Sequence, residues 1–458
     1  MDPSTILERG SEAYETSRRR FFNKGHPDRY PHQILHPRST AEVAAAVKYA
    51  SGLGKHISVR SGGHLFPCQH LQDGEILIDM KAVNPRFEYE PETQLINFGP
   101  GLTVQDAQDY LTPRKLFFPF GHSPTVGLGG FLLCGGQGYF MQGWGLTSDR
   151  WITQIEMVTA DGEIRICNRN ENADLFWAAR GGGMGFFGVV TKFWGRTSPA
   201  KKLYNTHWVF SADKYYDAFN WILDSAKIIR PYHTEAAICC CYADKYTGQG
   251  DEVQSKDVVI ATAITLYADS LEEAQAMAYP FDKCPLEPIF HLPVTETTYD
   301  ELNQAQENLM PSDEGLRYKC DSILNDPNVS RQEVCVSLSY YLMFKLLDAI
   351  KPLMLTLPSR RSSSVIYICD SFLPGNLAYS LISEYYIATY LVWSDAKDDE
   401  KHRKWLKETY REAAKVSCGT YVADFDADMR MTKVSYLSLY LITGDDGCSL
   451  EEMGWYQR

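Results

Sequence analysis

The chain has 458 residues, enough for two or three domains, and its 44% hydrophobic and 22% charged residues are typical of a globular protein, which excludes extended disorder. Lysine and arginine number 45 against 58 aspartates and glutamates, for a formal charge of -13. That balance argues against nucleic acid or an anionic membrane as a partner, because both need an accumulated basic face. The opening residues MDPSTILERG lack a basic stretch followed by an apolar core, so we expect a cytoplasmic protein.

In chain order, the first 200 residues alternate between helix-like and strand-like segments. A helix is predicted at 39–52, because Ser39 and Glu42 form a capping-box pattern before an alanine- and valine-rich run. Short apolar runs between turn-forming residues predict strands. These are expected at 56–59, 75–80, 94–98, 152–159, 163–167 and 187–193. The pattern indicates a mixed α/β domain, which we place at residues 1–202.

One run within this domain, 116–148, contains no Asp, Glu, Lys or Arg. It is long enough to span a bilayer, but nine glycines and two prolines interrupt it, so it is not a transmembrane helix. We expect buried backbone there, or backbone packed against a ligand.

From about residue 203, glycine becomes sparse and tyrosine frequent. The triplet Cys239, Cys240 and Cys241 is predicted to lie in a buried strand, and since no C-x-x-C pair occurs, no metal site is expected. Further strands are expected at 205–210, 258–267, 365–369 and 386–393, and helices at 270–278 and 398–415. We place a second domain at 203–416 and expect residues 417–458 to return to the first.

Three glycine-rich loops distinguish the first domain: 59–64, 121–138 and 180–188. Consecutive glycines after a strand let backbone N–H groups approach a diphosphate closely, although a Gly-Gly pair is often only a turn. None of the loops is a G-x-G-x-x-G motif opening a helix, and no P-loop occurs, so Rossmann and P-loop nucleotide sites are disfavoured. Three such loops in one domain favour a large nucleotide cofactor held in another way.

The residues 31–50, RSGGH at 60–64, GHSPTVGLGGFLLCGGQG at 121–138 and RGGGMGFFGVVTKF at 180–193 resemble, in order and spacing, the flavin domain of the vanillyl-alcohol oxidase and p-cresol methylhydroxylase (PCMH) superfamily. Within it the chain most resembles the berberine-bridge-enzyme-like oxidases. The resemblance implies an α+β, two-domain PCMH-type FAD-binding fold with an α/β substrate domain, an antiparallel sheet covered by helices. It implies that FAD is held by Arg60, Ser61, Gly62, Gly63, His64, His122, Ser123, Thr125, Val126, Gly127, Gly130, Gly136, Gly138, Gly183, Gly188 and Val189.

The resemblance also implies how FAD is attached. His64 matches the histidine that is joined covalently to the flavin's 8α-methyl carbon. Many relatives add a cysteine link in the second loop, but this chain has Ser123, whose hydroxyl cannot form that thioether, so one covalent bond is expected. His122 is expected either to hydrogen-bond near the flavin or to serve a structural role.

Three positions bear on catalysis by the same resemblance. Val126 matches the residue beside the flavin's C4a atom, where a small side chain favours access of O2, although plain packing is the alternative. Tyr421 matches the first tyrosine of a segment that presents proton-accepting groups above the flavin, and Asp424 stands where that segment has a second tyrosine. Asp424 is a better base at neutral pH than a tyrosine of ordinary pKa, unless it belongs to a solvated acidic turn with Asp426 and Asp428.

The sequence therefore predicts an FAD-linked oxidase acting on an alcohol or amine carbon of a small organic substrate, of secondary-metabolite or carbohydrate type, with O2 reduced to H2O2. Two alternatives stay open. One is a cyclase or isomerase that keeps the flavin as a scaffold, and the other is a non-catalytic flavoprotein that passes electrons to a partner chain.

Overall fold

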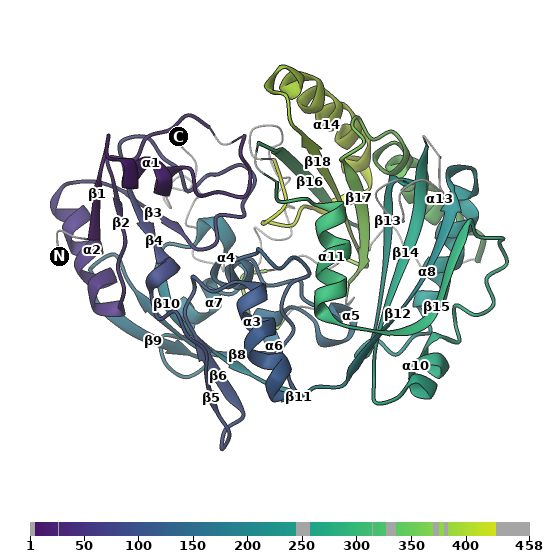
Figure 1. Ribbon diagram of the computed structural model, residues 1–458, viewed down its shortest axis with the longest axis horizontal. Coiled ribbons are helices and arrows are strands. Elements are labelled where there is room, and N and C mark those ends of the chain that lie inside the picture. The colour runs from purple at the N-terminus through teal and green to yellow at the C-terminus, as the bar shows by residue number, and fades with distance from the viewer. Residues whose placement is uncertain are drawn as a thin grey trace.

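The computed structural model describes residues 5–25, 27–243, 257–313, 315–326, 336–369, 375–379 and 383–426. Two sheets and a short ribbon lie in the first 200 residues, and one large sheet lies in the remainder of the described chain. Figure 1 shows the two halves side by side, with helix α11 (Tyr299–Leu309) between them. This arrangement confirms the two-part α+β architecture expected from the sequence.

Short strands make up the first half. One sheet, in the order β1-β2-β4-β3, contains β1 (Ile6–Glu8), β2 (Gln33–Leu35), β4 (Ile76–Asp79) and β3 (Ile57–Arg60). The other, in the order β5-β6-β10-β8-β9, contains β5 (Glu88–Glu90), β6 (Leu95–Phe98), β10 (Val189–Arg196), β8 (Ile152–Val158) and β9 (Ile164–Asn168). Strands β7 (Leu116–Phe117) and β11 (Ser198–Pro199) form the ribbon. Because β3 ends at Arg60 and β10 begins at Val189, the first and third glycine loops emerge from strand ends.

The helices of the first half are α1 (Glu12–Arg18), α2 (Thr40–Gly52), α3 (Val104–Leu111), α4 (Leu128–Leu133), α5 (Met141–Trp144), α6 (Thr147–Arg150) and α7 (Ala173–Ala178). Helix α2 is the one predicted from Ser39, whose hydroxyl accepts the Glu42 N–H at 3.3 Å. The Glu42 carboxylate accepts the N–H of Arg38, not that of Ser39, so the cap is a shifted form of the predicted box. Helix α4 lies within the second glycine loop, and α6 holds the end of that loop, because the N–H groups of Thr147 and Ser148 donate to the carbonyls of Gly136 and Gly135.

A single antiparallel sheet forms the second half, in the order β15-β12-β14-β13-β17-β18-β16-β19. Its strands are β12 (Lys202–Ser211), β13 (Thr234–Tyr242), β14 (Val258–Ala268), β15 (Phe290–Thr297), β16 (Arg317–Asn325), β17 (Ser363–Ile368), β18 (Tyr385–Trp393) and β19 (Ser417–Gly419). The cysteine triplet lies in β13 and is buried, as predicted, because β13 is paired on both sides.

Helices cover one face of this sheet: α8 (Tyr215–Ala226), α10 (Leu271–Ala278), α13 (Val336–Leu355) and α14 (Asp399–Ala413). Their apolar sides and alternate strand residues form the largest core cluster. Helix α11 stands on the other side and packs Leu302 into the core of the first half. The opposite face of the sheet therefore looks toward the glycine loops.

Two expectations differ in detail from the structure. The strand predicted at 187–193 begins at Val189, because Phe187 is 58% exposed and lies outside the sheet. Residues 417–419 extend the second sheet as β19 before the chain turns toward the first half, and residues 427–458, including Asp428, lie outside the described residues.

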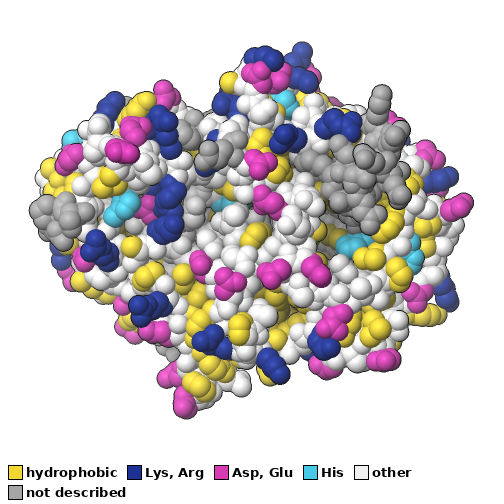
Figure 2. Space-filling view, viewed as in Figure 1, with side chains coloured by type: hydrophobic (Ala, Val, Ile, Leu, Met, Phe, Trp, Pro, Cys, Tyr) yellow, Lys and Arg dark blue, Asp and Glu magenta, His cyan; other side chains and the backbone are white. Residues whose placement is uncertain are grey.

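None of the described helices is long and apolar enough to cross a membrane. On the face drawn in Figure 2, acidic and basic side chains are interspersed.

Candidate functional site

A cavity of about 800 Å³ lies between the glycine loops and the open face of the eight-stranded sheet. Its walls come from 57–72, 121–141 and 183–190 of the first half, and from the central strands, α11 and 421–424 of the second. A volume of this size is typical of a cofactor and substrate site, and such sites often lie between domains. Both halves are needed to form it.

The first two glycine loops touch backbone to backbone. A Cβ atom built on Gly62 would lie 2.7 Å from the Gly127 nitrogen, so no larger residue fits. Gly63 has φ +75°, in the left-handed region that favours glycine. Ser61 joins this contact by donating its hydroxyl to the Pro100 carbonyl at 2.5 Å. The glycines thus expose main chain to the cavity, as a closely bound flat ligand requires.

Arg60 lines the cavity and also has a structural partner that the sequence did not reveal. Its guanidinium is buried and bonds the Asp79 carboxylate at 2.5 Å and the Ser17 carbonyl at 2.8 Å. Burial alone would raise the pKa of Asp79, but Arg60 and Arg20 together hold it down at about 2. Arg60 therefore fixes the loop to Asp79 and Ser17 through its terminal nitrogens, while its Nε has no partner among the described residues.

His64 lines the cavity at the end of this loop. Phe22 stacks on its ring with centroids 4.1 Å apart, and its Nε2 lies 3.1 Å from the Thr125 hydroxyl. The Ser123 hydroxyl is 3.3 Å from the same Thr125 oxygen. Burial lowers the pKa of His64 to about 4, so the imidazole is neutral at pH 7 and keeps a nitrogen lone pair.

Most of the predicted cofactor residues line the cavity, but four do not. Those that do are Arg60, Ser61, Gly62, Gly63, His64, His122, Ser123, Val126, Gly127, Gly130, Gly183 and Gly188. Thr125 stands behind His64, and Val189 pairs with Val158 inside the sheet. A Cβ on Gly136 would lie 3.0 Å from Phe131 and Thr147, and one on Gly138 would lie 2.2 Å from the Pro119 carbonyl oxygen. Gly136 and Gly138 are therefore required by protein packing.

The cavity fits FAD on two observations. A Cβ atom on Gly130 would meet nothing within 4 Å, so this turn of the loop faces open space. The buried Nε2 of His70 and Nε of Arg60 both belong to lining residues and have no hydrogen-bond partner among the described residues. Buried polar atoms without partners are rare, and a polar ligand would satisfy them.

Asp424 faces the cavity from the second half. Its carboxylate accepts the Tyr386 hydroxyl at 2.6 Å, Tyr390 also bonds it, and the two tyrosine oxygens are 3.0 Å apart. Burial raises the pKa of Asp424 to about 6, although both tyrosines lower it. Asp424 is therefore not part of a solvated turn, and neither is Asp426, which is 2% exposed and pairs with Lys319 at 2.6 Å.

Tyr421 packs edge-on to Tyr386 with centroids 5.7 Å apart. It is only 4% exposed, and burial raises its pKa well above the ordinary value. A tyrosine in this state is a poor base at neutral pH, so of the two predicted groups Asp424 is the better proton acceptor.

His122 joins the two halves. Its Nε2 lies 2.8 Å from the Glu235 carboxylate of β13, whose other oxygen accepts the Phe140 N–H at 2.7 Å. The ring also packs against Tyr139 and Tyr367, with centroids 4.4 and 4.7 Å away. His122 thus forms part of the cavity wall, and its imidazole is paired with the Glu235 carboxylate.

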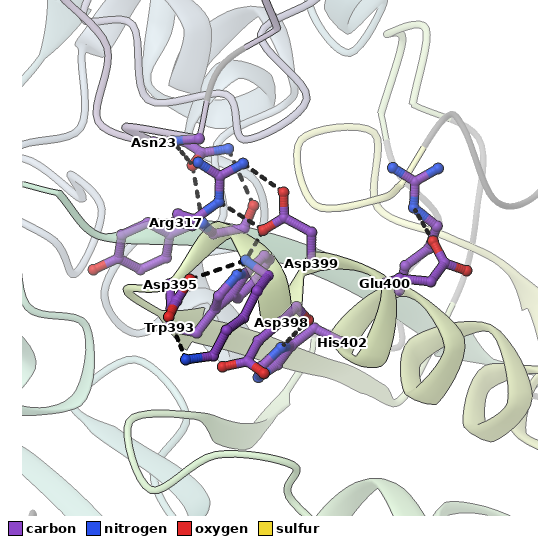
Figure 3. A network of polar contacts seen from close by, with 12 residues as sticks. Asn23, Arg317, Trp393, Asp395, Asp398, Asp399, Glu400 and His402 are labelled. Carbon is purple, nitrogen blue, oxygen red and sulfur yellow. Dashed lines mark hydrogen bonds and ion pairs between the residues drawn. The ribbon is translucent and has the colours of Figure 1, made fainter.

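A second link between the halves is the polar network around Asn23 and Arg317 (Figure 3). The Asn23 amide donates to the carbonyls of Phe66 and Tyr318 and accepts the Tyr318 N–H at 2.9 Å. Next to it, Arg317 bonds both oxygens of Asp399. Phe66 stacks on Tyr318 and contacts the rings of His64 and Tyr390, so this junction connects the surroundings of His64 with those of Asp424.

Sequence reasoning missed Tyr386, Tyr390 and Glu235. Tyr386 and Tyr390 lie four residues apart in β18 and so share one face of the strand, which is a pattern visible in the sequence. Their proximity to Asp424 was not visible, because it depends on the order of strands in the sheet. Glu235 had no signal, since a single glutamate before an apolar strand usually lies at the surface.

Comparisons with known proteins agree with this geometry. Residues 31–168 match the FAD binding domain family. The FAD-linked oxidoreductase nodO of Hypoxylon pulicicidum is 29% identical over 416 residues, covering 90% of this chain and 87% of that protein. Physcomitrella patens BBE-like 1 superposes with a TM-score of 0.76 at 20% identity, covering 95% of this chain and 92% of that one. The Acremonium strictum glucooligosaccharide oxidase, whose structure is described as revealing a novel flavinylation, has a TM-score of 0.72 at 19% identity, covering 92% and 87%.

Proposed function

Because the chain is an FAD-linked oxidoreductase with the berberine-bridge-like fold of the vanillyl-alcohol oxidase superfamily, we propose that it oxidises an alcohol or amine carbon of a small organic substrate and uses O2 as the final acceptor. For an alcohol the balanced reaction is R2CHOH + O2 → R2CO + H2O2. The C–H bond breaks with its electron pair, and the hydroxyl proton leaves to a base. When bound, FAD supplies the acceptor for the hydride and the route to O2.

Asp424 is the base in this proposal. The main support for the proposal is the position of this carboxylate in the cavity and its raised pKa. Recessed in the cavity with a pKa of about 6, it is ionised at pH 7 and still basic enough to accept a proton. Tyr386 donates to one carboxylate oxygen and so fixes the orientation of the group. An acid-base residue tuned toward neutrality inside a cofactor-sized cavity is typical of an active site.

The glycine loops hold the cofactor by their main chain, and His64 attaches it. The neutral imidazole can form a covalent bond, and the Phe22 ring limits its rotation. We expect no second covalent bond at Ser123, since a hydroxyl cannot form the thioether; its oxygen lies 3.3 Å from the Thr125 hydroxyl. Val126 lines the cavity, and in this proposal its small side chain lets O2 approach the flavin.

A substrate panel of alcohols, amines and sugars, assayed for peroxide by a coupled peroxidase, tests the proposal. We expect at least one member to release H2O2 in a one-to-one ratio with carbonyl product. Product formation without peroxide or flavin reduction would select the cyclase or isomerase reading. Flavin reduction that persists in air would point to electron transfer to a partner chain.

A further inference from the structure

The cavity continues past the glycine loops over the middle of the eight-stranded sheet. Cross-strand pairing places His207, Ala263 and Ala237 side by side on β12, β14 and β13. The same row continues through Tyr367 on β17 to Tyr386 on β18. All five residues line the cavity. The row therefore runs from Tyr386, which bonds Asp424, to His207 at the other end.

Small side chains form the middle of this row. Ala237 and Ala263 remain partly exposed, whereas their neighbours in sequence, such as Ala236 and Ile264, are fully covered. In a central strand, such exposure arises only where the face looks into a cavity. Four strand-to-strand steps of about 4.8 Å give a floor roughly 19 Å long between Tyr386 and His207.

Helix α11 closes the compartment from above with Leu302, Ala305 and Leu309. In Figure 1 it stands between the two halves, next to the end of the sheet formed by β16, β17 and β18. The space is therefore a slot between a sheet and a helix. A slot of this shape accepts a flat, rigid body more readily than a branched or globular one.

The centre of the row is less polar than its Tyr386 end, where Tyr367 also stands. Asp424, Tyr386 and Tyr390 gather at that end, whereas the alanines at the centre offer no hydrogen-bonding side chain. Glu235, which lines the same cavity, is already paired with His122 and with the Phe140 N–H. The ring nitrogens of His207 are engaged by Asn205 and by the Thr262 carbonyl within the sheet. An oligosaccharide laid along this floor would lose hydration at many hydroxyls without regaining hydrogen bonds.

We propose that this compartment binds a flat, rigid and mainly apolar substrate of several fused rings, whose hydroxyl- or amine-bearing carbon meets Asp424. The inference rests on the proposed oxidase function and names its substrate class. It makes Ala237, Ala263 and the α11 face specificity-determining, because they set the height of the slot.

Equilibrium dialysis of the purified flavoprotein tests it with two probes, epiandrosterone as a tetracyclic alcohol and cellotriose as a sugar of similar length. We expect epiandrosterone to bind and cellotriose to bind about 10-fold or more weakly. Ala263→Phe places a larger side chain on the sheet side of the slot, and Ala305→Trp places one on the helix side, so both narrow the slot. Because Ala305 is exposed on α11, we expect at least the Ala305→Trp protein to fold. Each should weaken epiandrosterone binding about 10-fold or more, whereas the matched variant Ala263→Ser, which keeps the height, should lose far less.

Dialysis needs no turnover, so the outcome is separable from that of the oxidase proposal. If the steroid binds but no peroxide forms, the proposed substrate class is supported and only the oxidation of that particular alcohol is refuted. Equal or tighter binding of cellotriose, or steroid binding that is insensitive to both blocking variants, would overturn the inference.

Discussion

Replacing Asp424 with asparagine removes the proposed base while keeping its shape and its contact with Tyr386. With a pKa of about 6, the carboxylate is roughly nine-tenths ionised at pH 7 and one-tenth ionised at pH 5. The base works only when ionised. In the unmutated protein, the rate of flavin reduction should therefore rise with pH through about 6 and fall roughly 10-fold from pH 7 to pH 5.

Anaerobic stopped-flow mixing at a saturating substrate concentration measures that rate directly. Asp424→Asn should lower it about 10²–10⁴-fold, the usual contribution of general acid–base catalysis, and the remaining rate should lose the step near pH 6. Tyr386→Phe removes a hydrogen bond that lowers the pKa of Asp424, so the step should move to higher pH.

Asp426→Asn is the matched control, because Asp426 is also a buried aspartate of this segment but pairs with Lys319 and does not line the cavity. It should cost stability and leave the pH step in place. If Asp424→Asn reduced its flavin at the normal rate, or kept the step near pH 6, the proton would be taken by another group and the assignment would be wrong.

Three further predictions concern the cofactor side of the cavity. His64→Ala should release FAD into the supernatant after acid precipitation, whereas the unmutated protein should keep its yellow colour in the pellet, and free FAD from the latter would contradict the covalent link. Val126→Leu should slow reoxidation by aerated buffer with nearly unchanged reduction, and stopped-flow showing the reverse would place Val126 on the substrate side. Asp79→Asn leaves Arg60 buried and unpaired, so chemical denaturation should show a loss of about 3–5 kcal/mol, with unchanged stability as the contrary result. Because the pKa of Asp79 lies near 2, this carboxylate's contribution of about 2 kcal/mol is present above pH 4 and lost as the pH falls to 2.

Local patterns in the sequence were enough to predict most of the strands of four or more residues, but only three of the described helices, α2, α10 and α14. The strand expected at 258–267 is β14, Val258–Ala268, and the helix expected at 270–278 is α10, because apolar runs and capping residues act over a few positions. The order of strands in the large sheet could not be predicted, since it depends on contacts between residues up to 130 positions apart, such as Ala237 and Tyr367. That order brings Tyr386 to Tyr367 and Ala237.

The same limit applies to the site. Glycine density located the cavity, but it did not separate a glycine needed for a ligand, such as Gly130, from one needed for packing, such as Gly138. In the sequence, the two kinds of glycine cannot be distinguished. The ion pair of Arg60 with Asp79 could not be predicted either, because Asp79 is 19 residues away and becomes its neighbour only when β3 pairs with β4.

The most direct test of the central claim is an anaerobic titration of the protein with an active substrate, followed by admission of air. The flavin absorbance should bleach in proportion to substrate, with one equivalent of product formed for each flavin reduced, and air should restore the absorbance with release of one equivalent of H2O2. Product that accumulates while the flavin stays oxidised, or bleaching that air does not reverse, would contradict the oxidase function proposed for this chain.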